Sequence, residues 1–578
     1  MKYMHCIIAS LALLVLPTNL AAIVPGWSSE QISTITPVTA IKPVAQFSGV
    51  DAHGNFFAVW QDRINGNGVA VAAIYRPGLG WLPEIILSDP AQNVGIPTAT
   101  IKENGEAYVI WSNFSLGEVE AAVNPNIGAL NWLTPVQISN TVAAGNELDP
   151  DSLPIISSAS QINAVVAVWL EGPVQLDEPQ VYANWNNGFG WNISNVQRLS
   201  TNNNISSLQP NVNVGNGGIA IAAWAEEHIT PDFFTAVYAN VFRFDTLAWE
   251  PVSTPVSSTA AGSHAVASIA QSQAPAVVVS GFGIGFLAWH ITNPDQTNDI
   301  QIAFYQPGGS FTAPITFTET FPPLPLDYVQ PKLVQNDEGV TWLGFLGINL
   351  FNTSQSYVFA SSTLISTQGA PQFTTPVAVN QPAPPAPFYP PPTTLNFDIA
   401  INGLGNALFT WSSLTEIFAS SITLGQAPLP QQLVYASTAP LAAQFNARLS
   451  NTNVAEVFIF DNITSFSVVS PAVDVIAVRG VGVVAPQNAP NFSGYTVENR
   501  TLSRKFPANK LSWNVTVDPT VASYQLFRNG VQIAAFPVSA PHSYTDVLFD
   551  PGIPNTYTLY SLDANGLMSE GVSVALNQ

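Results

Sequence analysis

One short segment recurs along most of the chain: a glycine or asparagine, five mostly small or apolar residues, and then a tryptophan or phenylalanine. Its copies are Gly54–Trp60, Gly105–Trp111, Asn163–Trp169, Gly218–Trp224, Gly283–Trp289, Gly339–Phe345 and Gly405–Trp411, with a degenerate eighth ending at Phe460. From Trp60 to Phe460 the spacing averages near 57 residues. A repeat of this kind predicts an array in which each copy belongs to one supersecondary unit. We call these segments anchors, and the surrounding repeats units 1 to 8.

The strands of each unit can be placed around its anchor. In unit 1, residues 44–50 (VAQFSGV) lead through the turn at Asp51–Gly54 into the anchor, and residues 69–75 and 81–88 supply two further strands. The anchor itself is apolar on both faces, as a strand buried between two sheets should be. Four strands in about 57 residues suit one blade of a β-propeller. The sequence therefore predicts an all-β protein with a propeller of seven or eight blades over residues 23–482, and eight is preferred.

The two ends of the array are expected to complete one blade. Unit 8 has no outer strand of its own that runs from a tryptophan to a serine, whereas Trp27–Ser33 forms such a segment without an anchor. Pairing the two would remove exposed strand edges and close the ring.

The units resemble the Gly-Asn…Val-Trp repeats of secreted bacterial β-propeller proteins over roughly residues 24–480. The fold implied is that of a sialidase-like propeller without strict Asp boxes, and no Gly-His…Trp-Asp pair of the WD type is present. The resemblance implies a fold and leaves the chemistry open.

The strand period changes after residue 498. Leu511-Ser512-Trp513 lies on a first strand, Tyr524–Phe527 leads into the Asn529-Gly530 turn, and Tyr557–Leu562 alternates strictly before a final strand. These features resemble a fibronectin type III domain, an immunoglobulin-like β-sandwich. We predict this domain over residues 499–578, joined to the propeller by a linker over 483–498.

The N-terminus and the composition indicate where such a protein works. Lys2, an apolar run and Ala21-Ala22 form the pattern of a signal peptide over residues 1–22, which predicts a periplasmic or extracellular protein. The single cysteine, Cys6, lies within this segment, so no disulfide is expected in the remainder. The net charge of -22 argues against nucleic acid as a partner, and no later segment is long and apolar enough to span a membrane. We expect a monomer.

Candidate functional residues follow the anchors, because a propeller gathers ligand groups on loops that leave the second strand of each blade. These positions hold Asp62, Arg63, Asn113, Glu171, Glu226, Glu227, His228, His290, Asp295, Ser413, Asp461 and Asn462. From them we select a binding set of Asp62, Arg63, Glu171, Glu226, Glu227, His228 and Asp295.

Three interpretations of this binding set remain open. Its members could be solvated loop residues with no shared role. They could form an acidic rim that attracts a carbohydrate, a cationic protein or a Ca²⁺ ion. Alternatively, Glu171 and Glu226 could act as acid and base on a glycan. The arginines do not form the three-arginine clamp of sialidases, and the histidines lack zinc-ligand spacing. The sequence favours a non-catalytic binding or surface-interaction protein without a cofactor, with a glycan hydrolase or lyase as the alternative.

Overall fold

The computed structural model describes most of the chain. The described residues are 27–33, 47–77, 79–129, 131–141, 146–149, 153–173, 179–200, 206–228, 234–251, 253–259, 264–265, 274–293, 295, 297–317, 326–352, 355–364, 372–380, 396–437, 441, 445–451, 454–463, 472–481, 486–500, 505–529, 531–547, 549, 554–563, 568–569 and 571–576. The predicted signal peptide lies outside them. Within the described residues, no helix is long and apolar enough to cross a membrane.

All eight units share one strand order in antiparallel sheets, and most of these sheets have four strands. The first strands are β2 (Phe47–Val50), β7 (Thr98–Ile101), β12 (Ile155–Ser158), β16 (Ser206–Gly215), β22 (Ala276–Val279), β26 (Leu326–Gln335), β30 (Asn396–Ile401) and β34 (Phe445–Leu449). The anchor strands are β3 (Phe56–Ile64), β8 (Ala107–Asn113), β13 (Val165–Pro173), β17 (Ile219–His228), β23 (Gly285–Thr292), β27 (Val340–Asn349), β31 (Ala407–Ser412) and β35 (Val454–Ile463). The third strands are β4 (Asn67–Arg76), β9 (Glu118–Asn124), β14 (Gln180–Asn186), β18 (Phe234–Arg243), β24 (Asn298–Tyr305), β28 (Ser356–Leu364), β32 (Glu416–Ile422) and β36 (Ala472–Val481).

The outer strands are shorter and more exposed, as the sequence predicts. They are β5 (Gly80–Trp81), β6 (Ile85–Ile86), β10 (Val136–Gln137), β15 (Gln197–Arg198), β19 (Ala248–Trp249), β20 (Thr254–Pro255), β25 (Ile315–Phe317), β29 (Val377–Ala378), β33 (Gln432–Ala436) and, for unit 8, β1 (Trp27–Gln31). The remaining elements here are β11 (Asn146–Leu148), β21 (His264–Ala265) and the 3₁₀ turns η1 (Ile127–Ala129) and η2 (Ile193–Asn195). Strand β21 pairs with both β18 and β23, so units 4 and 5 form one ten-stranded sheet.

A repeated turn explains the glycine that opens each anchor. The anchor glycines Gly54, Gly105, Gly218, Gly283, Gly339 and Gly405 have φ angles between 73° and 84°. A side chain would be strained at these angles, whereas glycine adopts them freely. Three residues earlier, a polar side chain often caps the turn: Asp51 Oδ1 accepts from the backbone N–H groups of His53 and Asn55, each at 2.9 Å. The same turn then recurs from unit to unit.

Buried side chains fill the space between successive units. In seven interfaces the anchor aromatic residue packs toward the preceding unit, as Trp111 does against Phe57 and Val59 of unit 1, and between units 7 and 8 Trp27 takes this place. Trp224 likewise contacts Val166 and Val168 of unit 3. Eight of the nine clusters of buried residues are of this kind. The array is therefore held together by sheet-on-sheet packing, in a propeller-like arrangement.

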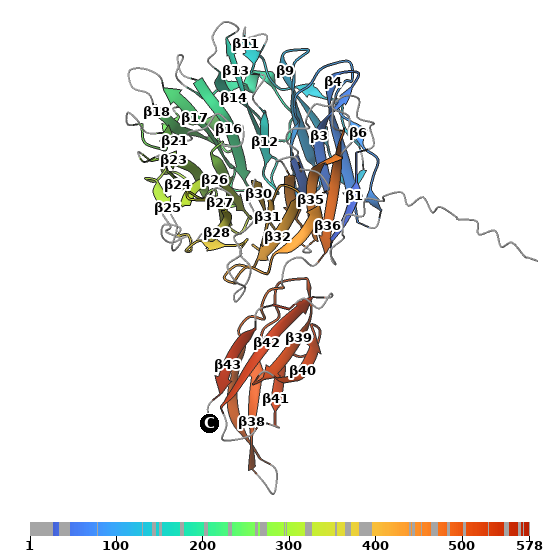
Figure 1. Cartoon of the computed structure of the whole chain (residues 1–578), viewed down its shortest axis with the longest axis vertical. Helices are drawn as coiled ribbons and strands as arrows, with labels where there is room; N and C mark the ends of the chain where they lie inside the picture. Colours follow the sequence, from blue (N-terminus) through green and yellow to red (C-terminus); the bar gives the residue numbers. More distant parts are fainter. Residues whose placement is uncertain are drawn as a thin grey trace, which may run out of the picture.

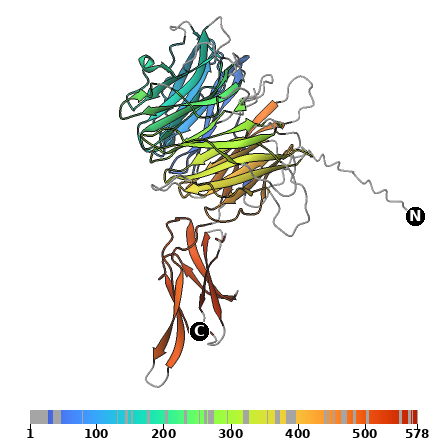
Figure 2. The ribbon, with the colours of Figure 1, turned by 90° about the vertical axis from the view of Figure 1, so that its left-hand side faces the viewer.

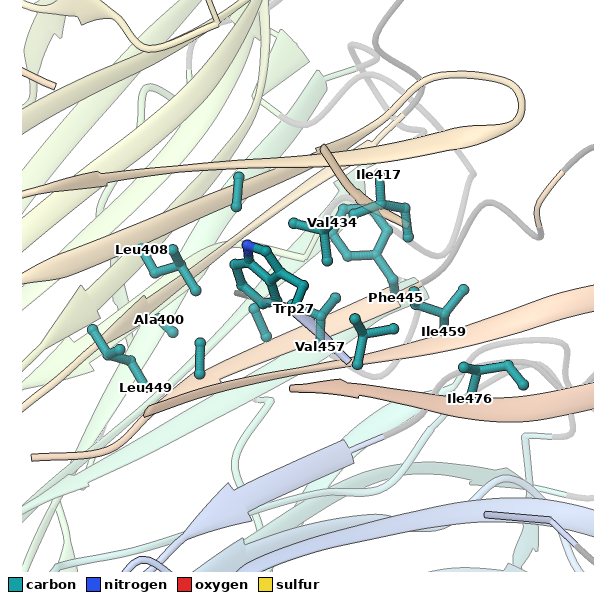
Figure 3. Packing of buried hydrophobic residues seen from close by; sticks show 14 of the residues in the cluster. Trp27, Ala400, Leu408, Ile417, Val434, Phe445, Leu449, Val457, Ile459 and Ile476 are labelled. Carbon is teal, nitrogen blue, oxygen red and sulfur yellow. The ribbon is translucent and has the colours of Figure 1, made fainter. Parts of the chain in front are cut away.

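The array closes on itself. Each first strand neighbours the first strand of the next unit, and β34 of unit 8 neighbours β2 of unit 1. The N-terminal strand β1 pairs antiparallel with β36, from Trp27 opposite Gly480 to Gln31 opposite Ile476, which confirms the predicted closure. Figure 1 shows β1 beside β35 and β36, where the colours return from orange to blue. Trp27 is buried among residues of units 7 and 8, including Leu408 and Val457 (Figure 3).

A row of ionisable side chains lies in the sheet of unit 8, at its seam with unit 1. Arg448, Glu456 and Arg479 lie opposite one another on β34, β35 and β36. Glu456 is fully buried, with its Oε1 3.1 Å from a guanidinium nitrogen of Arg479. The guanidinium of Arg479 in turn lies 3.8 Å from the ring centre of Tyr75 in unit 1. Burial raises the pKa of Glu456 to about 8, although the charge of Arg479 opposes this shift.

The C-terminal region forms a separate two-sheet sandwich (Figure 2). One sheet contains β37 (Ser493–Arg500), β38 (Lys505–Ser512) and β41 (Ser543–Asp546), and the other contains β39 (Val521–Arg528), β40 (Val531–Pro537), β42 (Asn555–Asp563) and β43 (Val572–Leu576). Trp513, Tyr524 and Tyr557 are buried between them. The first strand of the sandwich, β37, pairs with β38 from Ser493 onward, ahead of the predicted boundary at residue 499. This edge strand is largely polar and exposed, so it lacks the apolar alternation that marks the others.

Candidate functional site

The sequence-predicted binding set lies where the anchor strands end. Asp62 and Arg63 are near the end of β3, Glu171 is near the end of β13, and Glu226, Glu227 and His228 end β17. Asp295 lies in the connection between β23 and β24. Asp461 and Asn462 belong to β35.

Two of these carboxylates accept a hydrogen bond from the tryptophan of their own anchor. Because side chains alternate along a strand, the residue two positions after the tryptophan shares its face. The indole Nε1 of Trp169 donates to Glu171 at 3.1 Å, and that of Trp224 donates to Glu226 at 3.0 Å. Both glutamates are buried. Burial raises the pKa of Glu171, while hydrogen bonds from Thr141 and Trp169 act in the opposite direction.

Glu226 and His228 are brought together at the end of β17. His228 Nε2 lies 3.5 Å from Glu226 Oε2 and 3.4 Å from the hydroxyl of Tyr238. The imidazole stacks on Phe234 with a centroid distance of 4.2 Å. Partial burial lowers the pKa of His228 and so favours the neutral form of the ring. The sequence did not indicate the roles of Phe234 and Tyr238, which lie on the next strand.

The remaining members of the binding set have separate surroundings. Asp62 accepts from the backbone N–H of Arg63 at 2.6 Å, and burial raises the pKa of its carboxyl group. Asp295 is exposed, and the hydroxyl and backbone N–H of Thr297 lower its pKa by donating to it. Glu227 is half-buried next to Glu226. These residues thus lie on several units and have their own local partners.

Replacement of Glu226 by alanine is expected to lower the free energy of unfolding by about 2–3 kcal/mol, because the buried indole N–H of Trp224 loses its acceptor. Thermal unfolding followed by tryptophan fluorescence measures the change. The matched control is Glu227→Ala, next in the chain and half-buried, for which a change below about 0.5 kcal/mol is expected. Equal effects of the two substitutions would contradict the assignment of Glu226 to the indole.

A hollow lies at the opposite end of the ring, where the turns between first strands and anchor strands meet. Its volume is about 200 Å³. Six units contribute to its wall, namely units 1, 2, 3, 6, 7 and 8. The lining residues are Val50, Asp51, Ala52, Glu103, Ser160, Gln335, Asn336, Asp337, Ile401, Asn402, Gly403, Leu449, Ser450 and Asn451. We call this feature the axial hollow.

Hydrogen bonds between neighbouring turns hold the wall of the axial hollow. The backbone N–H of Ala52 donates to the carbonyl of Glu103 at 3.1 Å, and that of Glu103 donates to Ser160 at 3.2 Å. On the other side, Asn336 Nδ2 donates to the carbonyl of Gly403 at 3.0 Å. Ser160 Oγ donates to Asp337 Oδ2 at 2.6 Å and so joins unit 3 to unit 6 across the ring. The wall is therefore a fixed structure built from distant parts of the chain.

The axial hollow carries negative charge. Asp51, Glu103 and Asp337 line it, and the pKa of Glu103 is raised by burial and by the nearby charge of Asp337. In the part of the chain that the structure describes, no three His, Cys, Asp or Glu side chains lie together as a metal site would require.

The sequence contained a signal for this site that the predictions did not use. The residue two positions before the anchor glycine lines the axial hollow in several units, as Ala52, Glu103, Asp337 and Gly403 do. The turn at Asp51–Gly54 was interpreted as a hairpin alone. Aligning the turns by their glycines would have grouped these positions at one end of the ring, but which of them meet at the axis depends on the fold.

No protein-family model and no curated protein matches the sequence. Among solved structures, similarity is found to a fungal alcohol oxidase of the AA5 family in complex with copper, at 11% identity and a TM-score of 0.41, covering 96% of this chain and 99% of the other. The polysaccharide lyase Uly1 matches at 7% identity and a TM-score of 0.37, covering 65% and 88%. The Hadza microbial sialidase Hz136 matches at 10% identity and a TM-score of 0.32, covering 75% and 74%. Similarities this low carry no argument about the chemistry of this chain.

Proposed function

We propose that this chain is a non-catalytic, extracytoplasmic binding protein whose ligand enters the axial hollow. In this proposal the ring is an eight-bladed β-propeller in which β1 supplies the outer strand of the last blade. The C-terminal sandwich is a fibronectin type III-like domain that acts as a spacer or second contact. The signal-peptide pattern at residues 1–22 supports export.

The observation that carries the proposal is the convergence of side chains from six units on one hollow. Polar residues from separate turns meet there in fixed positions, which is how a rigid scaffold builds a binding site. The segment that leads into the sandwich contacts the ring nearby, because Gln487 Nε2 donates to the carbonyl of Leu404 at 3.3 Å, next to Gly403 in the wall. A ligand in the hollow would lie close to this contact.

The test compares two tryptophan substitutions in one turn. Ala52 is exposed and lines the hollow, so Ala52→Trp should fill it, whereas the side chain of the adjacent His53 is 73% exposed to solvent. The full-length variants and the parent protein are applied to arrays of glycans, peptides and small metabolites. Binding by the parent and by His53→Trp, with loss in Ala52→Trp, is the expected result.

Equal binding by all three proteins would place the ligand elsewhere and overturn the proposal, as would no binding by the parent protein. Turnover of an arrayed glycan that is lost in Glu171→Ala would instead support the hydrolase alternative. Loss of binding in a triple variant of Asp62, Glu171 and Glu226 to alanine, with no effect of Ala52→Trp, would favour the acidic-rim interpretation.

A further inference from the structure

We infer that the axial hollow takes a compact organic cation, either a free amine or the ammonium group of a lysine side chain. This inference rests on the proposed function, since it names the ligand class of that same site. Three observations support it: the hydrogen-bonding groups of the wall that already have partners, the negative charge of the wall and the volume of the hollow.

Most hydrogen-bond donors of the wall already have acceptors in other turns. The backbone N–H groups of Ala52 and Glu103 each donate to a neighbouring turn, and the hydroxyl of Ser160 donates across the ring to Asp337. Gly403 N–H donates to Asn451 Oδ1 at 2.6 Å, and Asn336 donates to the carbonyl of Gly403. A ligand that mainly accepts hydrogen bonds would thus meet few free donors.

Acceptor capacity remains in excess. Each carboxylate offers about four lone-pair sites. The Glu103 carboxylate accepts from Gln161 Nε2 at 3.3 Å, and Asp337 accepts from Ser160. Asp51 is more fully used, because its two oxygens accept from His53, Asn55 and the Asn55 amide. Glu103 and Asp337 are therefore the groups with capacity for a donor ligand.

The basic side chains near the hollow face carboxylates other than Glu103 and Asp337, and His53 Nδ1 lies 3.8 Å from Asp51 Oδ2. Lys102, next to Glu103 in the chain, has its Nζ 2.6 Å from Glu106. On the first strands that lead to the hollow, Lys332 lies 3.2 Å and Arg448 3.9 Å from Asp398. Among the described residues, no basic side chain lies within ion-pair distance of Glu103 or Asp337. A bound cation would relieve the repulsion between these two carboxylates.

The volume indicates a small group with several donors. One water molecule needs only about 10–15 Å³ of such space, so a hollow of about 200 Å³ admits a ligand group of several heavy atoms. An ammonium group has three donors and a positive charge, which match the acceptor-rich wall. Asp51 is held by its own turn, which leaves two carboxylates for the ligand and favours an organic cation over a metal ion.

The experiment is isothermal titration calorimetry of the full-length protein with spermidine, with the peptide acetyl-Gly-Lys-Gly-amide and with the neutral polyol erythritol. Binding of either cation is expected, and the stronger of the two identifies the source as a free amine or a lysine side chain. The variants Glu103→Gln and Asp337→Asn keep the size of the side chain and remove its charge. Each should raise the Kd for the cation about tenfold, the effect of losing roughly one ion pair.

The controls separate this inference from the proposed function. His53→Trp should leave the Kd unchanged, and Ala52→Trp should abolish binding. If neither cation binds, or if Glu103→Gln and Asp337→Asn leave the Kd unchanged, the cation inference is wrong. In that event, erythritol or an array ligand that is still excluded by Ala52→Trp would leave the proposed function standing. If Ala52→Trp excludes no ligand at all, both fail.

Discussion

Removal of residues 24–36 is expected to lower the thermal unfolding midpoint by more than 10 °C and to make unfolding begin at the seam. Strand β1 supplies five residue pairs to β36 and buries Trp27 between units 7 and 8. Loss of a buried tryptophan alone costs about 3–5 kcal/mol. The deletion also exposes the edge of β36, where a new chain could pair. Differential scanning calorimetry, with light scattering for aggregation, measures both effects.

Two point variants locate the effect within the strand. Trp27→Ala should reproduce most of the loss, because the side chain is 3% exposed and its indole also donates to Gln432 at 3.0 Å. Ser29→Ala, on the exposed part of the same strand, should change the midpoint by no more than about 1 °C. An unchanged transition in the deletion variant would show that β1 contributes nothing to the ring.

Stability is expected to fall as the pH rises from about 4.5 to about 8, and the substitution Glu456→Gln should remove much of that fall. The folded state holds the Glu456 proton up to a pKa of about 8, whereas the unfolded chain releases it near 4.5. Between these pH values, ionisation of this carboxyl group stabilises the unfolded state alone. The free energy of unfolding therefore falls as the pH rises and levels off above a pH of about 8. Because Arg479 lies beside the carboxylate, we expect an effect on the order of 2–4 kcal/mol.

Unfolding midpoints at pH 5.0 and pH 8.5 provide the measurement. The parent protein should be less stable at pH 8.5, and the difference between the two pH values should shrink in Glu456→Gln. Burial raises the pKa of Glu171 as well, so some of the slope should remain in this variant. The same slope in both proteins would mean that the Glu456–Arg479 pair does not titrate in this range. Glu227→Gln, on β17 of unit 4, serves as a charge-matched control.

The repeat architecture could be predicted because its signals are local. Most anchors combine a glycine that a tight turn requires with an apolar strand and an aromatic residue, and the structure places Trp60, Trp111 and Trp169 at successive interfaces. The closing strand could also be predicted, because unit 8 lacks an outer strand of its own and the N-terminus carries one that belongs to no anchor.

The axial hollow could not be derived from the same reasoning. Its wall depends on which turns meet across the ring, and the bond between Ser160 and Asp337 joins residues 177 positions apart. Nothing local distinguishes those side chains from ordinary polar turn residues. The residues after the anchors were easier to notice because they follow an apolar run. Yet Glu171 and Glu226 turn back to their tryptophans, which strand alternation would have predicted had it been applied.

The pairing of β1 with β36 also dictates an order of assembly. Trp27 leaves the ribosome early, and its partner Gly480 follows more than 450 residues later. The first strand must therefore remain unpaired until the last unit has been synthesised. An exposed strand of this kind invites capture by another chain. A nascent chain that stops short of residue 480 should thus be an unclosed, aggregation-prone intermediate. The cell would need to protect the N-terminal strand β1 until synthesis is complete.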